Sequence, residues 1–102
     1  MKIGRVAGTV VATRKSPKLE ATKLLIVEEC DMEGKPKGSF VVAADTVQAG
    51  VGDTVLLVAG SSARLAYPKE GTPIDAAISA VIDSIDYKGK TVQPNALKPG
   101  EN

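Results

Sequence analysis

The sequence predicts an all-β protein, a small five-stranded Greek-key barrel of the OB type with one short helical element. Two observations lead to this fold class. Runs of strand length rich in Val, Ile and Thr recur along the chain, and turns containing Gly, Pro and Asp separate them. The chain has 102 residues, enough for one domain. Short strands at this spacing are typical of a small barrel or sandwich.

Three of the five expected strands lie in the first half of the chain. Gly4 and Gly8 inside the first strand predict sharp curvature or a close approach of two backbones, as at a barrel corner. A polar loop over 14–22 follows this strand. Residues 31–38 contain Gly, Pro and charged side chains, which predicts a surface turn between antiparallel neighbours. The three strands are expected at 3–13, 23–29 and 39–44.

The second half is harder to assign. A flexible connection over 45–52 precedes a fourth strand at 53–59. The apolar spacing from Ile74 to Ile85 fits a helix and also a strand. Pro73 favours a first helical turn, whereas the density of β-branched residues after Ile78 favours a strand. We therefore expect a short helical turn at 73–77 and a fifth strand at 78–87.

A change in composition marks the end of the expected barrel. Lys88, Gly89 and Lys90 predict a turn, and Pro94 and Pro99 interrupt the sequence beyond it. We expect one barrel domain over 1–87 and an irregular C-terminal tail over 88–102, which either frays or drapes over a neighbouring subunit.

Composition and charge limit the possible partners. Lys and Arg total 13 against 12 Asp and Glu, a formal net charge of +1 that gives no general attraction to nucleic acid or to an anionic membrane. No apolar run approaches the roughly 18 residues of a membrane span, and the first residues lack the apolar stretch of a signal peptide. The single Cys30 cannot form an internal disulfide, and we expect it to be a small buried hydrophobe. These features predict a cytoplasmic protein.

The usual catalytic groups are missing from the sequence. It has no histidine, which excludes Ser-His-Asp and Cys-His arrangements, and one cysteine cannot build a structural zinc site. Neither glycine-rich phosphate motif occurs; Gly50-Val51-Gly52 is a fragment that precedes a strand. Neighbouring carboxylates such as Glu28 and Glu29 point to opposite faces of a strand. We therefore expect no enzyme activity, no cofactor and no metal.

Barrels of the OB type often bind nucleic acid, which makes a single-stranded nucleic-acid-binding module the alternative function. Arg14, Lys15, Lys18 and Lys23 fall in and beside the first loop and could contact phosphates. Binding of single strands, however, uses aromatic side chains on which bases stack, and neither of the first two strands contains one. A solvated loop is the favoured interpretation.

Two short motifs follow the fourth strand. Gly60 permits a sharp exit from the strand, Ser61 or Ser62 can cap a turn, Ala63 leaves space for close approach, and Arg64 offers a planar set of donors. The second motif, residues 73–77, supplies a carboxylate flanked by small residues. These motifs could be two capped turns within one monomer, or a surface for packing against a second copy.

The motifs and their order resemble the EutN/CcmL family of bacterial microcompartment vertex proteins, found in carboxysomes and in ethanolamine- or propanediol-using compartments. Gln48 stands where the family more often has glycine. The resemblance covers residues 1 to about 86. Its matching segments are 6–13 (VAGTVVAT), 23–27 (KLLIV), 44–53 (ADTVQAGVGD), 60–64 (GSSAR), 73–77 (PIDAA) and 81–83 (VID).

The resemblance implies a structural protein whose OB-like barrels form a cyclic pentamer at the fivefold vertices of a shell. Its partners would be copies of itself and the hexameric shell proteins of the same compartment; a hexameric ring of this chain is a less favoured state. A core of small aliphatics with 3% aromatics would also gain from packing against copies of itself. The expected subunit interface is Gly60, Ser61, Ser62, Ala63, Arg64, Asp75, Ala76 and Ala77, with an Arg64–Asp75 pair; the expected shell-contact loop includes Arg14, Lys15 and Lys18.

Overall fold

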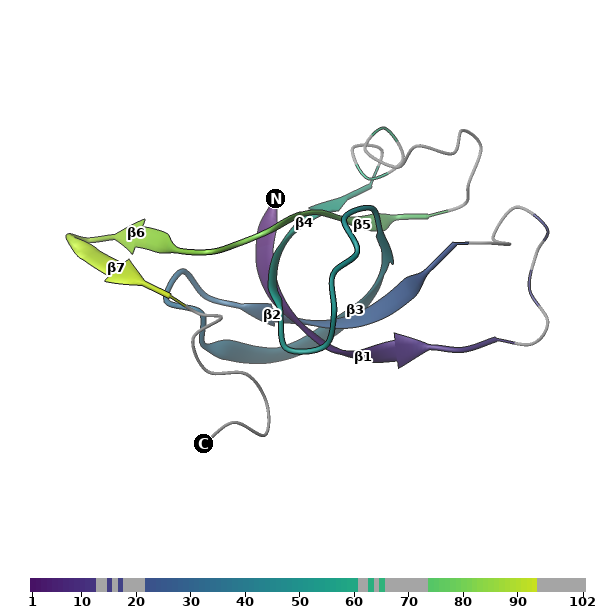
Figure 1. Ribbon diagram of the computed structural model, residues 1–102, viewed down its shortest axis with the longest axis horizontal. Helices are drawn as coiled ribbons and strands as arrows, with labels where there is room; N and C mark the ends of the chain where they lie inside the picture. The colour runs from purple at the N-terminus through teal and green to yellow at the C-terminus, as the bar shows by residue number, and fades with distance from the viewer. Residues whose placement is uncertain are drawn as a thin grey trace.

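Five strands close into a barrel in the computed structural model, and two more form a separate hairpin (Figure 1). The structure describes residues 1–12, 15, 17, 22–60, 63, 65 and 74–93. The barrel strands are β1 (Lys2–Val10), β2 (Leu24–Cys30), β3 (Pro36–Asp45), β4 (Thr54–Ala59) and β5 (Ala76–Val81), and the hairpin strands are β6 (Ile85–Tyr87) and β7 (Lys90–Val92).

The strand order confirms the predicted OB-type barrel. Around the barrel the order is β1-β2-β3-β5-β4, and β4 returns to pair with β1. All neighbours are antiparallel except β3 and β5, which are parallel and meet at Ala44–Ala77 and Asp45–Ile78. Strand β1 pairs with both β2 and β4, which is how a five-stranded sheet closes on itself.

The barrel interior is filled by small aliphatic side chains from alternate strand positions. In β2, Leu25 and Val27 are fully buried, while Ile26 between them is only half-buried. Each fully buried Leu, Ile or Val contributes about 1.5–3 kcal/mol relative to an exposed one. The main core cluster is Val6, Leu25, Val27, Ala43, Ala49, Val55, Leu57, Ala76 and Ile78.

Gly4 lies where two strands approach closely, as the sequence predicted. It pairs with Glu29 of β2 on one side and Val55 of β4 on the other. A Cβ at this position would collide with Cγ1 of Val27 and lie 3.0 Å from the Glu28 carbonyl oxygen. Gly8 instead adjoins a register shift in β1, at which the strand bends.

The helical turn expected at 73–77 is wrong for its last two residues, because Ala76 and Ala77 begin strand β5. They pair with Ala59 and Val58 of β4, and Ala77 also faces Ala44 of β3. These long-range pairings outweigh the weak local preference for a helix. Helical conformation occurs instead at Ala63 and Leu65.

The fifth strand and the tail also differ from the expectation. Strand β5 ends at Val81, and residues 82–84 are not in a strand. The predicted turn at Lys88 and Gly89 is confirmed, but it joins β6 to β7, so residues 90–92 are not irregular. Pairing between the two segments supplies the backbone hydrogen bonds that neither could make alone.

Other strands shift by a few residues at their ends. Strand β1 stops at Val10, and β3 begins at Pro36 inside the predicted turn. A proline is tolerated there because it is the first residue of its strand, next to a bulge in the pairing with β2. Among the described residues, no helix is long and apolar enough to cross a membrane.

Candidate functional site

The reactive side chains of the described residues do not form a catalytic or metal-binding cluster. No group of three or more Cys, Asp and Glu side chains in this part of the chain is placed to hold a metal ion. Burial raises the pKa of the Cys30 thiol, which keeps it protonated and unreactive. The Glu29 carboxylate accepts hydrogen bonds from Lys2 Nζ (2.9 Å) and Ser39 Oγ (3.0 Å), and these lower its pKa. Its role is to join three strands at the surface.

The two motifs of the expected interface lie side by side, although they are far apart in the sequence. The Gly60 N–H donates to the Asp75 carbonyl oxygen at 2.8 Å, which extends the pairing of Ala59 with Ala76 by one step. Gly60 has a φ of 64°, so it makes the sharp exit that its sequence position predicted. Both Gly60 and Asp75 are exposed. The structure therefore brings described residues of the two motifs, Gly60 and Asp75, together within one subunit.

The alanines of these motifs are buried inside their own subunit. Ala63 and Ala77 are fully buried and Ala76 is 5% exposed. Ala63 and Ala77 belong to a second apolar cluster on the outer side of β4 and β5, which also contains Ala44, Val58 and Ile74. Ala63 packs within this cluster, three residues from the exposed Gly60, and Ala77 lies two residues from the exposed Asp75.

Several expected site residues lie outside the described part of the chain. They are Ser61, Ser62 and Arg64 of the first motif, and Arg14 and Lys18 of the first loop. The Arg64–Asp75 pair therefore stays a prediction. Lys15 is described and is exposed to solvent.

A cavity of about 300 Å³ lies next to the second motif. Its walls come from the start of β1, the ends of β2 and β4, the middle of β3, and the start of β5. No cluster of described reactive groups occupies it, and the Lys2–Glu29 ion pair lies on its wall. The lining residues are Met1, Lys2, Glu29, Val41, Leu57, Val58, Ala59, Asp75 and Ala76.

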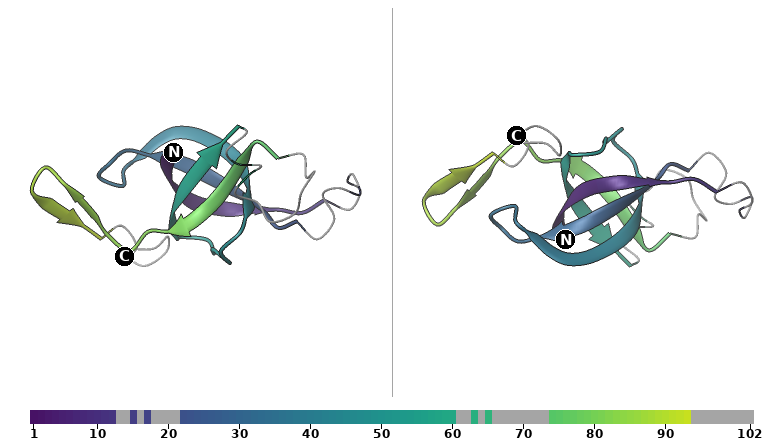
Figure 2. Two further views of the ribbon diagram at one scale, coloured as in Figure 1. Left: turned by 90° about the horizontal axis from the view of Figure 1, so that it is seen from above. Right: turned by 90° about the horizontal axis from the view of Figure 1, so that it is seen from below.

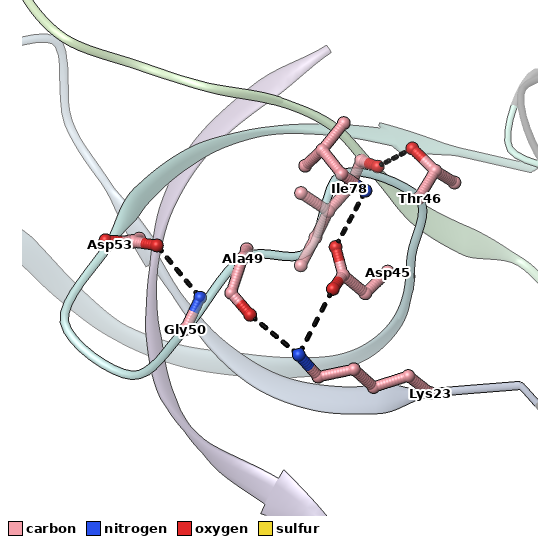
Figure 3. Close-up of polar contacts among 8 residues, drawn as sticks. Lys23, Asp45, Thr46, Ala49, Gly50, Asp53 and Ile78 are labelled. Carbon is pink, nitrogen blue, oxygen red and sulfur yellow. Dashed lines mark hydrogen bonds and ion pairs between the residues drawn. The ribbon is translucent and has the colours of Figure 1, made fainter.

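The connection between β3 and β4 closes the other side of the barrel through a set of polar contacts (Figure 3). It crosses the opening of the barrel in Figure 1 and inserts Ala49 into the main core cluster. Lys23 Nζ donates to the Ala49 carbonyl oxygen at 2.9 Å and forms an ion pair with Asp45 at 3.4 Å. The Asp45 side chain is only 2% exposed and accepts a hydrogen bond from the Val47 N–H at 3.0 Å.

Further contacts fix the ends of this connection. Thr46 Oγ1 donates to the Ile78 carbonyl oxygen at 2.6 Å, and Asp53 accepts a hydrogen bond from the Gly50 N–H at 2.8 Å. The Gly52 N–H donates to the Val6 carbonyl oxygen at 2.9 Å, next to the bend in β1. Gly50 and Gly52 therefore form part of the tight turn that leads into β4.

Gln48 adopts a left-handed conformation with a φ of 59°, where the family resemblance places a glycine. A side chain costs roughly 1–2 kcal/mol in this region of backbone space, and β-branched residues are the least tolerated there. We expect Gln48→Val to lower the free energy of unfolding by about 1–2 kcal/mol. Gln48→Gly relieves the strain and should be neutral or slightly stabilising, since its higher unfolded-state entropy offsets part of the gain.

Thermal unfolding of the three proteins at equal concentration measures both effects. The control is Val47→Ala, which removes an exposed apolar side chain at the neighbouring position. Equal stability of Gln48→Val and the unchanged protein would contradict the assignment of backbone strain.

The outer side of β2 and β3 is a further feature, which the sequence analysis did not single out. Ile26 lies directly opposite Val42, and Glu28 lies opposite Phe40. Phe40 is 60% exposed and Val42 46% exposed, and both lie in the part of β3 that pairs with β2. The signal in the sequence is the nearly continuous apolar run FVVAA, which is typical of a strand buried on both faces.

Comparisons with known proteins agree with this barrel. A family model described as "Ethanolamine utilisation protein EutN/carboxysome" matches residues 1–83. The chain is 42% identical over 92 residues to the bacterial microcompartment shell vertex protein EutN of Salmonella typhimurium, covering 90% of this chain and 93% of that protein. It is 41% identical over 92 residues to the carboxysome shell vertex protein CcmL of Synechococcus elongatus, with the same coverage of 90% and 93%.

A solved structure matches over the same region. The pentameric microcompartment shell protein GrpN from Rhodospirillum rubrum has a TM-score of 0.77 to this chain at 41% sequence identity. The match covers 85% of this chain and 100% of that one. The similarity in sequence and the similarity in fold therefore point to one family.

Proposed function

Because the chain belongs to the EutN/CcmL family, we propose that it forms a cyclic homopentamer that caps the fivefold vertices of a bacterial microcompartment shell. It is a structural protein of the shell, within the cytoplasm, and not an enzyme. The observation that carries this function is the identity of about 40% to shell vertex proteins across 90% of the chain. Flat layers of hexameric proteins do not close by themselves, and fivefold caps supply the curvature that closes the shell.

A cyclic ring needs two different complementary patches on each subunit, because its interface is heterologous. The first patch in our proposal contains the two motifs after β4. The Gly60–Asp75 hydrogen bond and the buried alanines support it, because they hold the exposed Gly60 and Asp75 in fixed positions on the barrel. Arg64 would complete the patch by pairing with Asp75. The contacts in this proposal would come from Gly60, Ser61, Ser62, Arg64 and Asp75, and the buried Ala63, Ala76 and Ala77 would support them from within the subunit.

The hexameric shell proteins of the same compartment are the proposed outer partners. The loop between β1 and β2 is the proposed contact, with Arg14, Lys15 and Lys18 as its cations. The exposure of Lys15 supports an outward role for this loop. The alternative, a module that binds single-stranded nucleic acid, gains no support from the family.

Native mass spectrometry at several protein concentrations tests the ring. We expect a dominant species of five copies of the 10.5 kDa chain. A stable monomer would refute the vertex function, and a dominant hexamer would refute the fivefold cap. Arg64→Ala should raise the concentration at which the ring dissociates by about tenfold, since each 1.4 kcal/mol of lost interaction is tenfold in affinity.

A charge-matched control separates the Arg64 contact from net charge. Lys15→Ala removes one cation from an exposed position in the outer loop and should leave the ring intact. An unchanged ring in Arg64→Ala would remove the Arg64–Asp75 pair from the interface and leave the pentamer itself standing.

A further inference from the structure

The hairpin of β6 and β7 stands apart from the barrel. Its strands pair only with each other, in a sheet separate from that of β1–β5. Figure 1 shows it projecting from one side of the molecule, and both views of Figure 2 agree. A two-stranded hairpin of three residues per strand is marginally stable at best in water. Its order therefore requires a surface to pack on.

The hairpin has one apolar and one polar face. Ile85 lies opposite Val92, and Tyr87 lies opposite Lys90 on the same face. Ile85, Tyr87 and Val92 are all half-buried. On the other face Asp86 and Thr91 are exposed, and Thr91 Oγ1 donates to Asp86 at 2.7 Å. The apolar face is the side suited to docking.

The barrel presents an exposed apolar surface on its outer side. We define the outer apolar face as Gly8, Ile26, Phe40 and Val42, which are cross-strand neighbours on the outer side of β1, β2 and β3. Phe40 and Val42 are exposed in the single subunit, and Gly8 carries no side chain that would obstruct a neighbour. A large aromatic and a β-branched side chain exposed together on a sheet mark an interaction surface.

Charges beside the two surfaces are complementary. Glu28 lies next to Phe40 on the outer apolar face, whereas Lys90 lies next to Tyr87 on the hairpin. Lys88 Nζ adds a second cation, 5.3 Å from the centre of the Tyr87 ring. Arg5 also lies beside Glu28, as its partner on β1, and donates through Nη2 to the Gly34 carbonyl oxygen at 3.5 Å. Opposite charges at matching positions favour one docking orientation.

We infer that the hairpin of one copy docks its apolar face on the outer apolar face of the next copy around the ring. This inference rests on the proposed pentamer and supplies the second contact of its heterologous interface. The occupant is a second copy because β6 and β7 do not join the barrel sheet of their own chain. It also explains why β2 and β3 are apolar on both sides: one side faces the barrel core and the other faces the neighbouring hairpin.

Cysteine cross-linking within the ring tests this contact directly. The probe is the full chain carrying Phe40→Cys and Val92→Cys in a Cys30→Ala background, treated with a short bismaleimide. We expect a ladder of covalent oligomers up to the pentamer on denaturing gels. The control carries Met32→Cys in place of Phe40→Cys, an exposed position in the β2–β3 turn that does not belong to the outer apolar face, and should give no ladder.

Three other results would overturn the inference, and they differ in what they say about the proposed pentamer. A pentamer in native mass spectrometry without a ladder would place the hairpin elsewhere and leave the proposed function standing. A linked monomer alone would place the hairpin on its own barrel. Absence of a pentamer in the Cys30→Ala background and in the unchanged chain would remove the proposed function and this inference together.

Matched lysine substitutions give a second readout. Val92→Lys places a charge in the contact, and we expect the concentration at which the pentamer dissociates to rise by about tenfold or more. Thr91→Lys adds a lysine on the opposite face of the same strand and should have little effect. Equal effects of the two substitutions would contradict the assigned face.

Discussion

Replacing Asp45 by alanine is expected to lower the free energy of unfolding by about 2–3 kcal/mol, because a buried carboxylate is lost that accepts a hydrogen bond from the Val47 N–H and pairs with the exposed Lys23. The Asp45 carboxylate is 2% exposed, accepts the Val47 N–H at 3.0 Å and lies 3.4 Å from Lys23 Nζ. Without it, the Val47 N–H loses its acceptor. The connection that inserts Ala49 into the core is then held by fewer contacts (Figure 3).

Asp45→Asn is the matched control, since it keeps the size of the side chain and an oxygen that can accept from Val47. It removes the charge alone, so we expect a smaller loss of about 1–2 kcal/mol. Denaturant unfolding of the three proteins measures these differences. Equal protein concentrations are essential, because assembly shifts the apparent stability by mass action.

Two results would contradict this account of Asp45. A loss below about 1 kcal/mol in Asp45→Ala would show that the connection does not depend on the carboxylate. An equal loss in Asp45→Asn and Asp45→Ala would assign the whole effect to charge and none to the Val47 hydrogen bond.

Gly4→Ala is expected to destabilise the barrel by about 2–3 kcal/mol through overpacking. The added Cβ would collide with Cγ1 of Val27 and lie 3.0 Å from the Glu28 carbonyl oxygen and 3.1 Å from Cδ1 of Leu57. The carbonyl belongs to the backbone of a paired strand, so it cannot move without disturbing the pairing of β1 with β2. A shift of this kind would disturb the barrel where β1 pairs with both β2 and β4.

Gly8→Ala is the control, because the same change at the bend in β1 meets only Cδ1 of Ile26, at an ordinary 3.6 Å. Thermal unfolding should separate the two variants clearly, since 1 kcal/mol corresponds to roughly 4–8 °C for a domain of this size. Equal melting temperatures for Gly4→Ala and Gly8→Ala would refute close packing at Gly4.

Part of the candidate site was also visible in the sequence. Gly60 was identified from local chemistry and the glycine-type position Gln48 from the family resemblance, and both have positive φ. The contact between Gly60 and Asp75 could not be predicted, because it depends on how β4 and β5 align across a connection of more than ten residues. The outer apolar face was likewise missed, because an apolar run does not say which of its two sides faces the core.

The sequence by itself determined the all-β class, the order of the first four strands, the close approach at Gly4 and the absence of histidine chemistry. Each of these depends on residues near one another in the chain: alternating apolar positions, turn residues, or one residue type. Only the tertiary structure decided that Ala76 and Ala77 are in a strand and that residues 85–92 form a hairpin outside the barrel. The physical reason is that pairing between distant segments sets the register of a strand, and the energy of that pairing exceeds the small local preferences that the sequence displays.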